Sequence, residues 1–240
     1  MAIKEQLISA QGNDRVFGLL AGPPGIGKTT QATTFPKEET AIISIEDGLL
    51  SIKGSGYFSF EIENYEDLIE VLEKRLKSSQ YKWIKYLLID SLSEIYDLIR
   101  RTAKLTFTQK ENFARNDEIK DKVFYCIRLA RGLDVNCFFT CHVKQEKNGV
   151  ILEDELAFDG KMPNELKKMF DTVVLMKEVT FDNAQPSRAF ILSPMLSKIS
   201  KARVSPWLGI TIADYEEPNL YKLVQKLLGI ANKGESNGKS

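Results

Sequence analysis

A glycine-rich stretch near the amino end constrains the fold of this chain more than any other feature. Residues 21–30 read AGPPGIGKTT and contain the pattern G-x-x-x-x-G-K-S/T, whose backbone N–H groups cradle phosphates. The apolar run 16–20 before it is typical of a buried strand, and the segment from Lys28 to Phe35 is typical of the start of a helix. A strand, a phosphate-binding loop and a helix in this order predict a nucleotide-binding α/β unit.

The residue types in this loop match the chemistry of a nucleoside triphosphate. Its glycines permit backbone conformations in which successive N–H groups point at phosphate oxygens. Lys28 is expected to reach the β- and γ-phosphates, and the Thr29 hydroxyl is expected to ligate Mg²⁺. The loop alone predicts ATP or GTP as the ligand, held by Gly22, Pro23, Pro24, Gly25, Ile26, Gly27, Lys28, Thr29 and Thr30.

Composition favours an ordinary globular protein of the cytoplasm. The chain has 240 residues, of which 43% are hydrophobic, so it can bury a sizeable core. Lysine plus arginine equals aspartate plus glutamate at 33 each, so any nucleic-acid site must be a local patch or arise by assembly. No apolar run is as long as a membrane span, and the three cysteines lack the spacing of a disulfide framework. We therefore expect a reducing, cytoplasmic location and no membrane partner.

Buried strands alternating with helices predict a mainly parallel central sheet with helices on both faces. After the phosphate-binding loop, strands are expected at 40–45, 57–62, 83–89 and 135–141, and helices at 64–78, 92–104 and 117–133. Asn64 is expected to cap its helix, and the segment 106–116 is expected to be a loop or a helix end.

The carboxyl-terminal part is predicted to contain further strands. Asn148-Gly149 predicts a hairpin over 144–156, followed by a short helix at 163–170, strands at 172–179 and 188–192, and a last helix at 220–228. We find no internal repeat and no linker. The predicted organisation is a lead-in at 1–14, one domain at 15–230 and a disordered tail at 231–240.

Two acidic residues follow predicted strands and should lie at the carboxyl edge of the sheet. Asp90 ends the apolar run 86–89, as in the Walker B pattern, and is expected to hold Mg²⁺; the alternative is a helix N-cap. Glu46 follows the strand at 40–45 and is predicted to orient the attacking water, with Asp47 as a direct competitor.

The sole histidine, His142, follows the predicted strand 137–141 at the same edge. It is predicted to sense the γ-phosphate and to pass the signal into the next loop, the alternative being an ordinary surface or core residue. Cys137 and Cys141 precede it, but no good fourth ligand lies nearby, so a zinc site is disfavoured. Both cysteines are therefore interpreted as buried apolar residues.

Taken in order, these motifs resemble the core of a RecA-type recombinase. The resemblance is closest to the phage-encoded, single-domain RecA-like ATPases used for single-strand annealing and recombination. It covers residues 16–230 and is carried by GPPGIGKT at 22–29, IEDG at 45–48, LIDS at 88–91, TCHV at 140–143 and KAR at 201–203. The resemblance implies a RecA-like P-loop NTPase core, ATP as the nucleotide, and the host cytoplasm as the location.

The resemblance also implies roles for particular residues. A strand-end glutamate activates water in RecA-like proteins, which supports Glu46, and RadA relatives carry a strand-end histidine like His142. The Lys-x-Arg motif of RadA and of replicative DnaB helicases reaches the γ-phosphate of the neighbouring subunit and matches Lys201 and Arg203. The alternative is a solvated basic pair. Residues 204–206 are VSP, where DnaB has a glycine, so the geometry of these two cations is open.

The same resemblance predicts that two loops face single-stranded DNA. Single-strand binding needs cations along a groove and aromatic faces, such as Phe107 and Phe113. The predicted DNA-binding cations are Arg100, Arg101, Lys104, Lys110 and Arg115 in the first loop, and Lys144 and Lys147 in the second, which spans 143–161. The alternative is a solvated charge run.

We therefore expect an ATP-dependent recombination or annealing protein that binds single-stranded DNA and itself, as a ring or a filament. Whether it also needs a single-strand DNA-binding protein as a partner stays open. A helicase-like or packaging motor shares the ATP chemistry but requires directed translocation. A small-molecule P-loop kinase would need an acceptor pocket and a lid, neither of which the sequence identifies, and a non-hydrolysing nucleotide switch is the weakest option.

Overall fold

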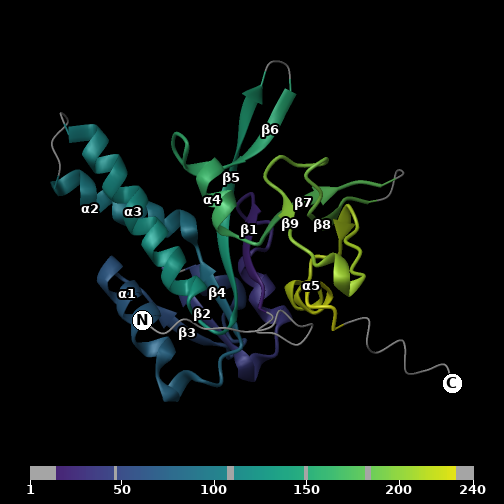
Figure 1. Ribbon diagram of the computed structural model, residues 1–240, viewed down its shortest axis with the longest axis horizontal. Coiled ribbons are helices and arrows are strands. Elements are labelled where there is room, and N and C mark those ends of the chain that lie inside the picture. Colours follow the sequence, from purple (N-terminus) through teal and green to yellow (C-terminus); the bar gives the residue numbers. More distant parts are fainter. Residues whose placement is uncertain (1–14, 46–47, 107–110, 149–150, 182–184, 231–240) are drawn as a thin grey trace.

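The computed structural model describes residues 15–45, 48–106, 111–148, 151–181 and 185–230 (Figure 1). The predicted lead-in at 1–14 and tail at 231–240 lie outside these ranges. Within them, the strands form one ten-stranded sheet in the order β10-β8-β7-β1-β5-β4-β2-β3, with β6 paired to β5 and β9 paired to β7.

The strands confirm a mainly parallel sheet. They are β1 Phe17–Gly22, β2 Thr40–Ser44, β3 Phe58–Glu61, β4 Tyr86–Asp90, β5 Asn136–Asn148, β6 Ile151–Leu156, β7 Thr172–Val179, β8 Ser187–Ile191, β9 Lys201–Ala202 and β10 Tyr215–Glu216. The six central and edge strands β7, β1, β5, β4, β2 and β3 pair in parallel, and β6, β8, β9 and β10 add antiparallel partners. The predicted β-rich carboxyl-terminal part is therefore present.

Helices cover both faces of the sheet, as predicted (Figure 1). They are α1 Tyr65–Glu73, α2 Leu92–Thr106, α3 Asn112–Arg131, α4 Met162–Met169 and α5 Leu220–Leu227. One apolar cluster joins the sheet to α1, α2, α3 and α4, and a second joins it to α5 and the segment after the phosphate-binding loop. The core is thus two apolar layers on either side of one sheet.

Several predicted boundaries shift for local reasons. The Asn64 side chain accepts a hydrogen bond from the Asp67 amide at 2.9 Å, which confirms the predicted cap of α1. α3 begins at Asn112, so residues 112–116 of the segment predicted as a loop or a helix end belong to a helix. β5 does not end at His142 but continues to Asn148, because it pairs with β6 in the predicted hairpin.

The helix predicted after Lys28 is a 3-10 helix over Thr29–Thr34 instead of an α-helix. The side chains of Thr30, Thr33 and Thr34 donate to carbonyls three residues earlier, at 2.7–2.8 Å. Such bonds and the poor helix propensity of threonine favour the tighter turn. Pro36 then limits any continuation, since the residue before a proline avoids helical conformation.

Gly18→Ala is expected to lower the free energy of unfolding by about 1–3 kcal/mol. A Cβ on Gly18 of β1 would lie 2.2 Å from the ring of Phe138, a fully buried side chain, so the core must move to admit it. Urea denaturation followed by circular dichroism measures the loss. Gly132→Ala is the comparison variant: its Cβ would lie 3.2 Å from the Leu129 carbonyl, a much smaller overlap, so it should lose less stability. Equal stability of the two variants would contradict the prediction.

Candidate active site

The phosphate-binding loop follows β1 at the carboxyl edge of the sheet. Gly25 and Gly27 have φ of +73° and +102°, so these two positions need glycine. The Ile26 side chain between them is 7% exposed and packs into the second apolar cluster. The loop is therefore anchored in the core by one side chain while its backbone stays open to a ligand.

Lys28 is held over this loop by backbone carbonyls. Its Nζ donates to the Gly22 and Pro23 carbonyls, at 2.9 Å each, and lies 3.3 Å from Nδ1 of His142. Only 7% of the residue is exposed, and this burial lowers its pKa, against the opposing influence of Cys141 and Asp90. The arrangement places an ammonium group in a low-dielectric site, where its attraction for phosphate is strong.

Thr29 and Asp90 form the oxygen pair expected of a Mg²⁺ site. Thr29 Oγ1 donates to Asp90 Oδ2 at 2.6 Å, and the Thr140 hydroxyl donates to Asp90 Oδ1. Within the described ranges no group of three or more His, Cys, Asp or Glu side chains could hold a metal ion. The residues fit Mg²⁺ rather than a cage-bound metal, since Mg²⁺ uses one or two protein oxygens plus phosphates and water.

Asp90 is not the cap of α2, the alternative that the sequence left open. Ser91 Oγ accepts the Glu94 amide at 3.2 Å, so Ser91 caps the helix and leaves both Asp90 carboxylate oxygens facing Thr29 and Thr140. The Asp90–Ser91 peptide bond is cis. Asp90 is therefore free of a capping role and available to a metal.

His142 lies beside the loop, as predicted, but inside a strand. β1 and β5 pair in parallel with Gly22 opposite His142, which brings the ring to Lys28. The His142 amide donates to Ser93 Oγ at 3.0 Å, and its carbonyl accepts from the Ala157 amide at 3.0 Å. The residue thus joins the loop to α2 and to the segment after β6.

These groups line a cavity of about 440 Å³, which brings Lys28, Thr29, Asp90 and His142 together. Sequence reasoning missed four of its residues, namely Ser51, Ser91, Glu94 and Arg188. The capping-box spacing of Ser91 and Glu94 could have revealed that pair. Arg188 reaches the cavity only through the pairing of β7 with β8, which no local pattern shows.

Glu46 and Asp47 lie outside the described residues, so the choice between them stays a prediction.

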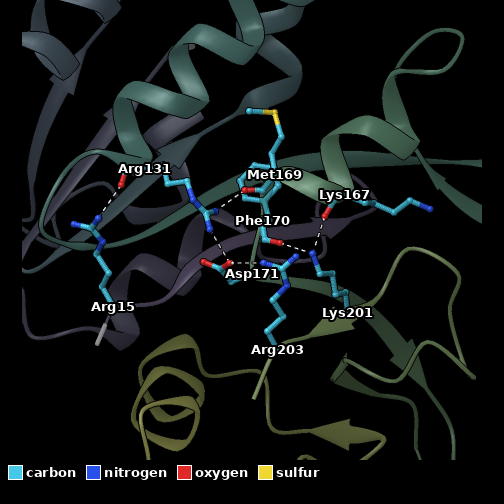
Figure 2. A network of polar contacts seen from close by, with 8 residues as sticks. All are labelled: Arg15, Arg131, Lys167, Met169, Phe170, Asp171, Lys201 and Arg203. Carbon is cyan, nitrogen blue, oxygen red and sulfur yellow. Dashed lines mark hydrogen bonds and ion pairs between the residues drawn. The ribbon is translucent and has the colours of Figure 1, made fainter. Parts of the chain in front are cut away.

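Lys201 and Arg203 lie away from this cavity. β9 pairs with the first residues of β7, at the amino edge of the parallel sheet, whereas the loop follows the carboxyl end of β1. Figure 2 shows Lys201 donating to the Phe170 carbonyl at 2.6 Å, and Arg203 paired with Asp171 at 3.2 Å. Burial and the charge of Arg203 lower the pKa of Lys201. Both cations therefore face one segment, but not the phosphate loop of their own chain.

A second cavity, of about 500 Å³, lies between α2, α3 and the start of α4, and we call it the basic groove. Five cations line it, namely Arg100, Lys104, Arg115, Lys120 and Lys161, together with Asp117, Asp159 and Glu165. The first three were predicted from the sequence, and Lys120 and Lys161 were missed because they come from other segments. Lys120 is paired with Glu165 at 2.6 Å, whereas Lys104 and Arg115 form no ion pair with any other described residue.

The other predicted DNA-binding residues do not join the basic groove where they are described. Arg101 is paired with Glu94 at 3.7 Å, and Lys144 is paired with Glu146 at 2.6 Å. Arg101 leaves the groove because it lies one residue from Arg100 on α2, and adjacent helical residues face different directions. Lys110, Phe107 and the side chain of Lys147 lie outside what the structure describes.

The cysteines are buried and free, as predicted. Cys137 and Cys141 are fully buried on β5, and burial raises the pKa of the Cys141 thiol to about 12. These two thiols are therefore the buried apolar residues that the sequence predicted.

The match to one protein family agrees with the phosphate-binding loop. Residues 15–204 match the AAA domain family, so the chain belongs to this family. The comparison with curated proteins gave no significant match. Among solved structures, a KaiC-like protein from the hyperthermophilic archaeon Pyrococcus horikoshii OT3 is similar, with 14% identity over 73% of this chain and 78% of that chain and a TM-score of 0.46. Over the described part of the chain, no helix combines the length and the apolar character that a membrane crossing requires. The protein is a P-loop ATPase of the AAA type.

Proposed function

We propose that this ATPase is a DNA recombination or single-strand annealing protein of the cytoplasm. It binds single-stranded DNA as an oligomer and hydrolyses ATP to ADP and phosphate at the interfaces between protomers. The observation that carries the proposal is the basic groove, where Arg100, Lys104 and Arg115 converge. Phe113, the predicted stacking residue, is 89% exposed but does not line the groove, because residues two apart on a helix face different directions.

The basic groove is physically connected to the nucleotide cavity. α2 begins next to Asp90 and carries Tyr96, whose hydroxyl donates to Asp159 at 2.8 Å on the groove wall. The His142 carbonyl accepts from Ala157, two residues before Asp159. Elements that contact the phosphate side of the cavity therefore also support the groove, which favours ATP hydrolysis that depends on DNA.

In this proposal, five groups of one protomer take part in hydrolysis. Lys28 would hold the β- and γ-phosphates, and Thr29 and Asp90 would hold Mg²⁺. Bound Mg²⁺ neutralises charge on the phosphate oxygens. His142, 3.3 Å from the Lys28 ammonium, senses the γ-phosphate, and Glu46 orients the attacking water. Lys201 and Arg203 complete the site of a neighbouring protomer, since they cannot complete their own.

The triple substitution Arg100→Ala, Lys104→Ala, Arg115→Ala is expected to weaken binding of a fluorescent oligothymidylate at least about tenfold in 0.1 M salt. It should also reduce the slope of log affinity against log salt by about 2, because each lost phosphate contact contributes about 0.7 for single strands. Fluorescence anisotropy at several salt concentrations measures both, and ATPase rates with and without DNA measure the stimulation.

The matched control removes the same charge elsewhere. Lys74, Lys77 and Lys82 are exposed between α1 and β4, and their triple alanine variant should bind DNA like the original protein. Equal weakening by both triple variants would show that net charge, and not the basic groove, controls affinity. An ATPase rate that ignores DNA, in a protein that binds none, would overturn the proposed function.

A further inference from the structure

Arg188 of β8 is a cation beside the phosphate-binding loop that the loop motif does not include. Its Nη1 lies 3.0 Å from the position that a Cβ on Gly27 would occupy, and Thr30 Oγ1 lies at the same distance from that position. Arg188 lines the nucleotide cavity and is exposed. Among the described residues it forms no hydrogen bond and no ion pair. Within the part of the chain that the structure describes, this guanidinium group therefore lies beside the loop backbone without a hydrogen-bond or ion-pair partner.

The sheet itself brings this arginine to the loop. The Met176 carbonyl of β7 is 2.8 Å from the Cβ position of Gly22, so Met176 lies beside the end of β1. Met176 pairs with Phe190 of β8, and Arg188 is two residues further out, beyond the carboxyl end of β1. Phe190 packs in the same apolar cluster as Ile26 of the loop, and alternate residues of a strand share a face. Arg188 therefore points to the face on which the loop lies.

The strand order places Arg188 and the metal-binding pair on opposite sides of the loop. β8 and β7 lie on one side of β1, and β5 and β4, with His142 and Asp90, lie on the other. The Thr29–Asp90 pair defines the side of the metal and the γ-phosphate. Gly27 and Thr30, next to Arg188, belong to the part of the loop whose N–H groups cradle the α- and β-phosphates.

We propose that Arg188 binds the α- and β-phosphates of the nucleotide held by its own protomer. The inference rests on the proposed ATP chemistry and adds a residue to it. A guanidinium group presents two parallel N–H donors to phosphate oxygens, and such charge-assisted hydrogen bonds are the strong ones. Because ADP keeps both phosphates, Arg188 supports ADP as well as ATP, unlike a group that reads the γ-phosphate.

Equilibrium titration with fluorescent ATP and ADP analogues in Mg²⁺ tests the assignment. Arg188→Ala should raise Kd about tenfold for both nucleotides, as expected for loss of a hydrogen bond to a charged group. Arg188→Lys keeps the charge but loses the pair of parallel N–H donors. Its Kd values should therefore lie between those of the unaltered protein and those of Arg188→Ala. Arg75→Ala removes an exposed arginine of a 3-10 helix that does not line the cavity, and it should bind both nucleotides normally.

Each outcome supports or overturns the assignment. Unchanged Kd values for Arg188→Ala would overturn it, and weakened ATP binding with normal ADP binding would place the arginine at the γ-phosphate instead. Failure of the unaltered protein to bind either nucleotide would overturn the proposed ATP chemistry, which is a different result. Thermal unfolding should be unchanged in Arg188→Ala, because the side chain is exposed and unpaired among the described residues; Arg188→Gln, of similar length, serves if the alanine variant unfolds.

Discussion

Lys28→Ala is expected to reduce ATP hydrolysis at saturating ATP at least about hundredfold. Only 7% of Lys28 is exposed, and its ammonium group is already oriented by the Gly22 and Pro23 carbonyls, so it needs little reorganisation to meet the β- and γ-phosphates. Preorganised charges in a water-poor site contribute most when negative charge develops in the transition state. Release of inorganic phosphate, measured as a function of ATP concentration, gives kcat and KM separately.

Two further lysine variants make this result specific. Lys28→Arg keeps the positive charge but spreads it over a larger, planar group. This variant should also lose most of the ATPase activity. Lys74→Ala removes an exposed lysine at the end of α1 and should hydrolyse ATP normally. Lys28→Ala should still unfold cooperatively on heating, and a rate within threefold of the original in a folded Lys28→Ala protein would contradict the assignment.

The sequence predicted the nucleotide cavity because its parts obey local rules. Lys28 and Thr29 belong to one continuous motif, and Asp90 ends an apolar strand. Parallel strands end at the same edge of a sheet, so residues that follow such strands meet there whatever their separation in the chain. The structure shows this directly: Gly22 of β1 pairs with His142 of β5, and Ser44 of β2 pairs with Asp90 of β4.

The positions of Arg188 and of the Lys201–Arg203 pair could not be predicted in the same way. β8 and β9 both pair with β7 in antiparallel orientation, but at opposite ends of it. Which end each strand occupies depends on register, and a short strand such as Lys201–Ala202 has too little hydrophobic pattern to fix its register from sequence. The Lys201–Arg203 motif can therefore be recognised in the sequence, but its position in the fold cannot be predicted from it.

Arg203→Ala and Lys201→Ala are each expected to reduce ATP hydrolysis, the arginine variant by about a thousandfold, the lower end of the effect of an arginine finger. Arg203 contacts Asp171, five residues before Met176, which lies beside Gly22. At about 3.3 Å per residue this spacing is roughly 16 Å, beyond the reach of an arginine side chain. The expected loss therefore requires a second protomer. Lys167→Ala should retain activity within about twofold, because Lys167 contacts Lys201 only through its backbone carbonyl and its side chain points away (Figure 2).

A mixture of Lys28→Ala and Arg203→Ala proteins should recover activity that neither has alone. Each productive interface pairs the intact loop of an Arg203→Ala protomer with the intact arginine of a Lys28→Ala protomer. At equal amounts and random mixing, roughly one quarter of the interfaces have this composition in a head-to-tail assembly. A mixture of Lys28→Ala with Asp90→Asn should stay inactive, because both residues belong to the cavity of one chain. If the first mixture also stayed inactive while light scattering showed assembly, Arg203 would not act between protomers.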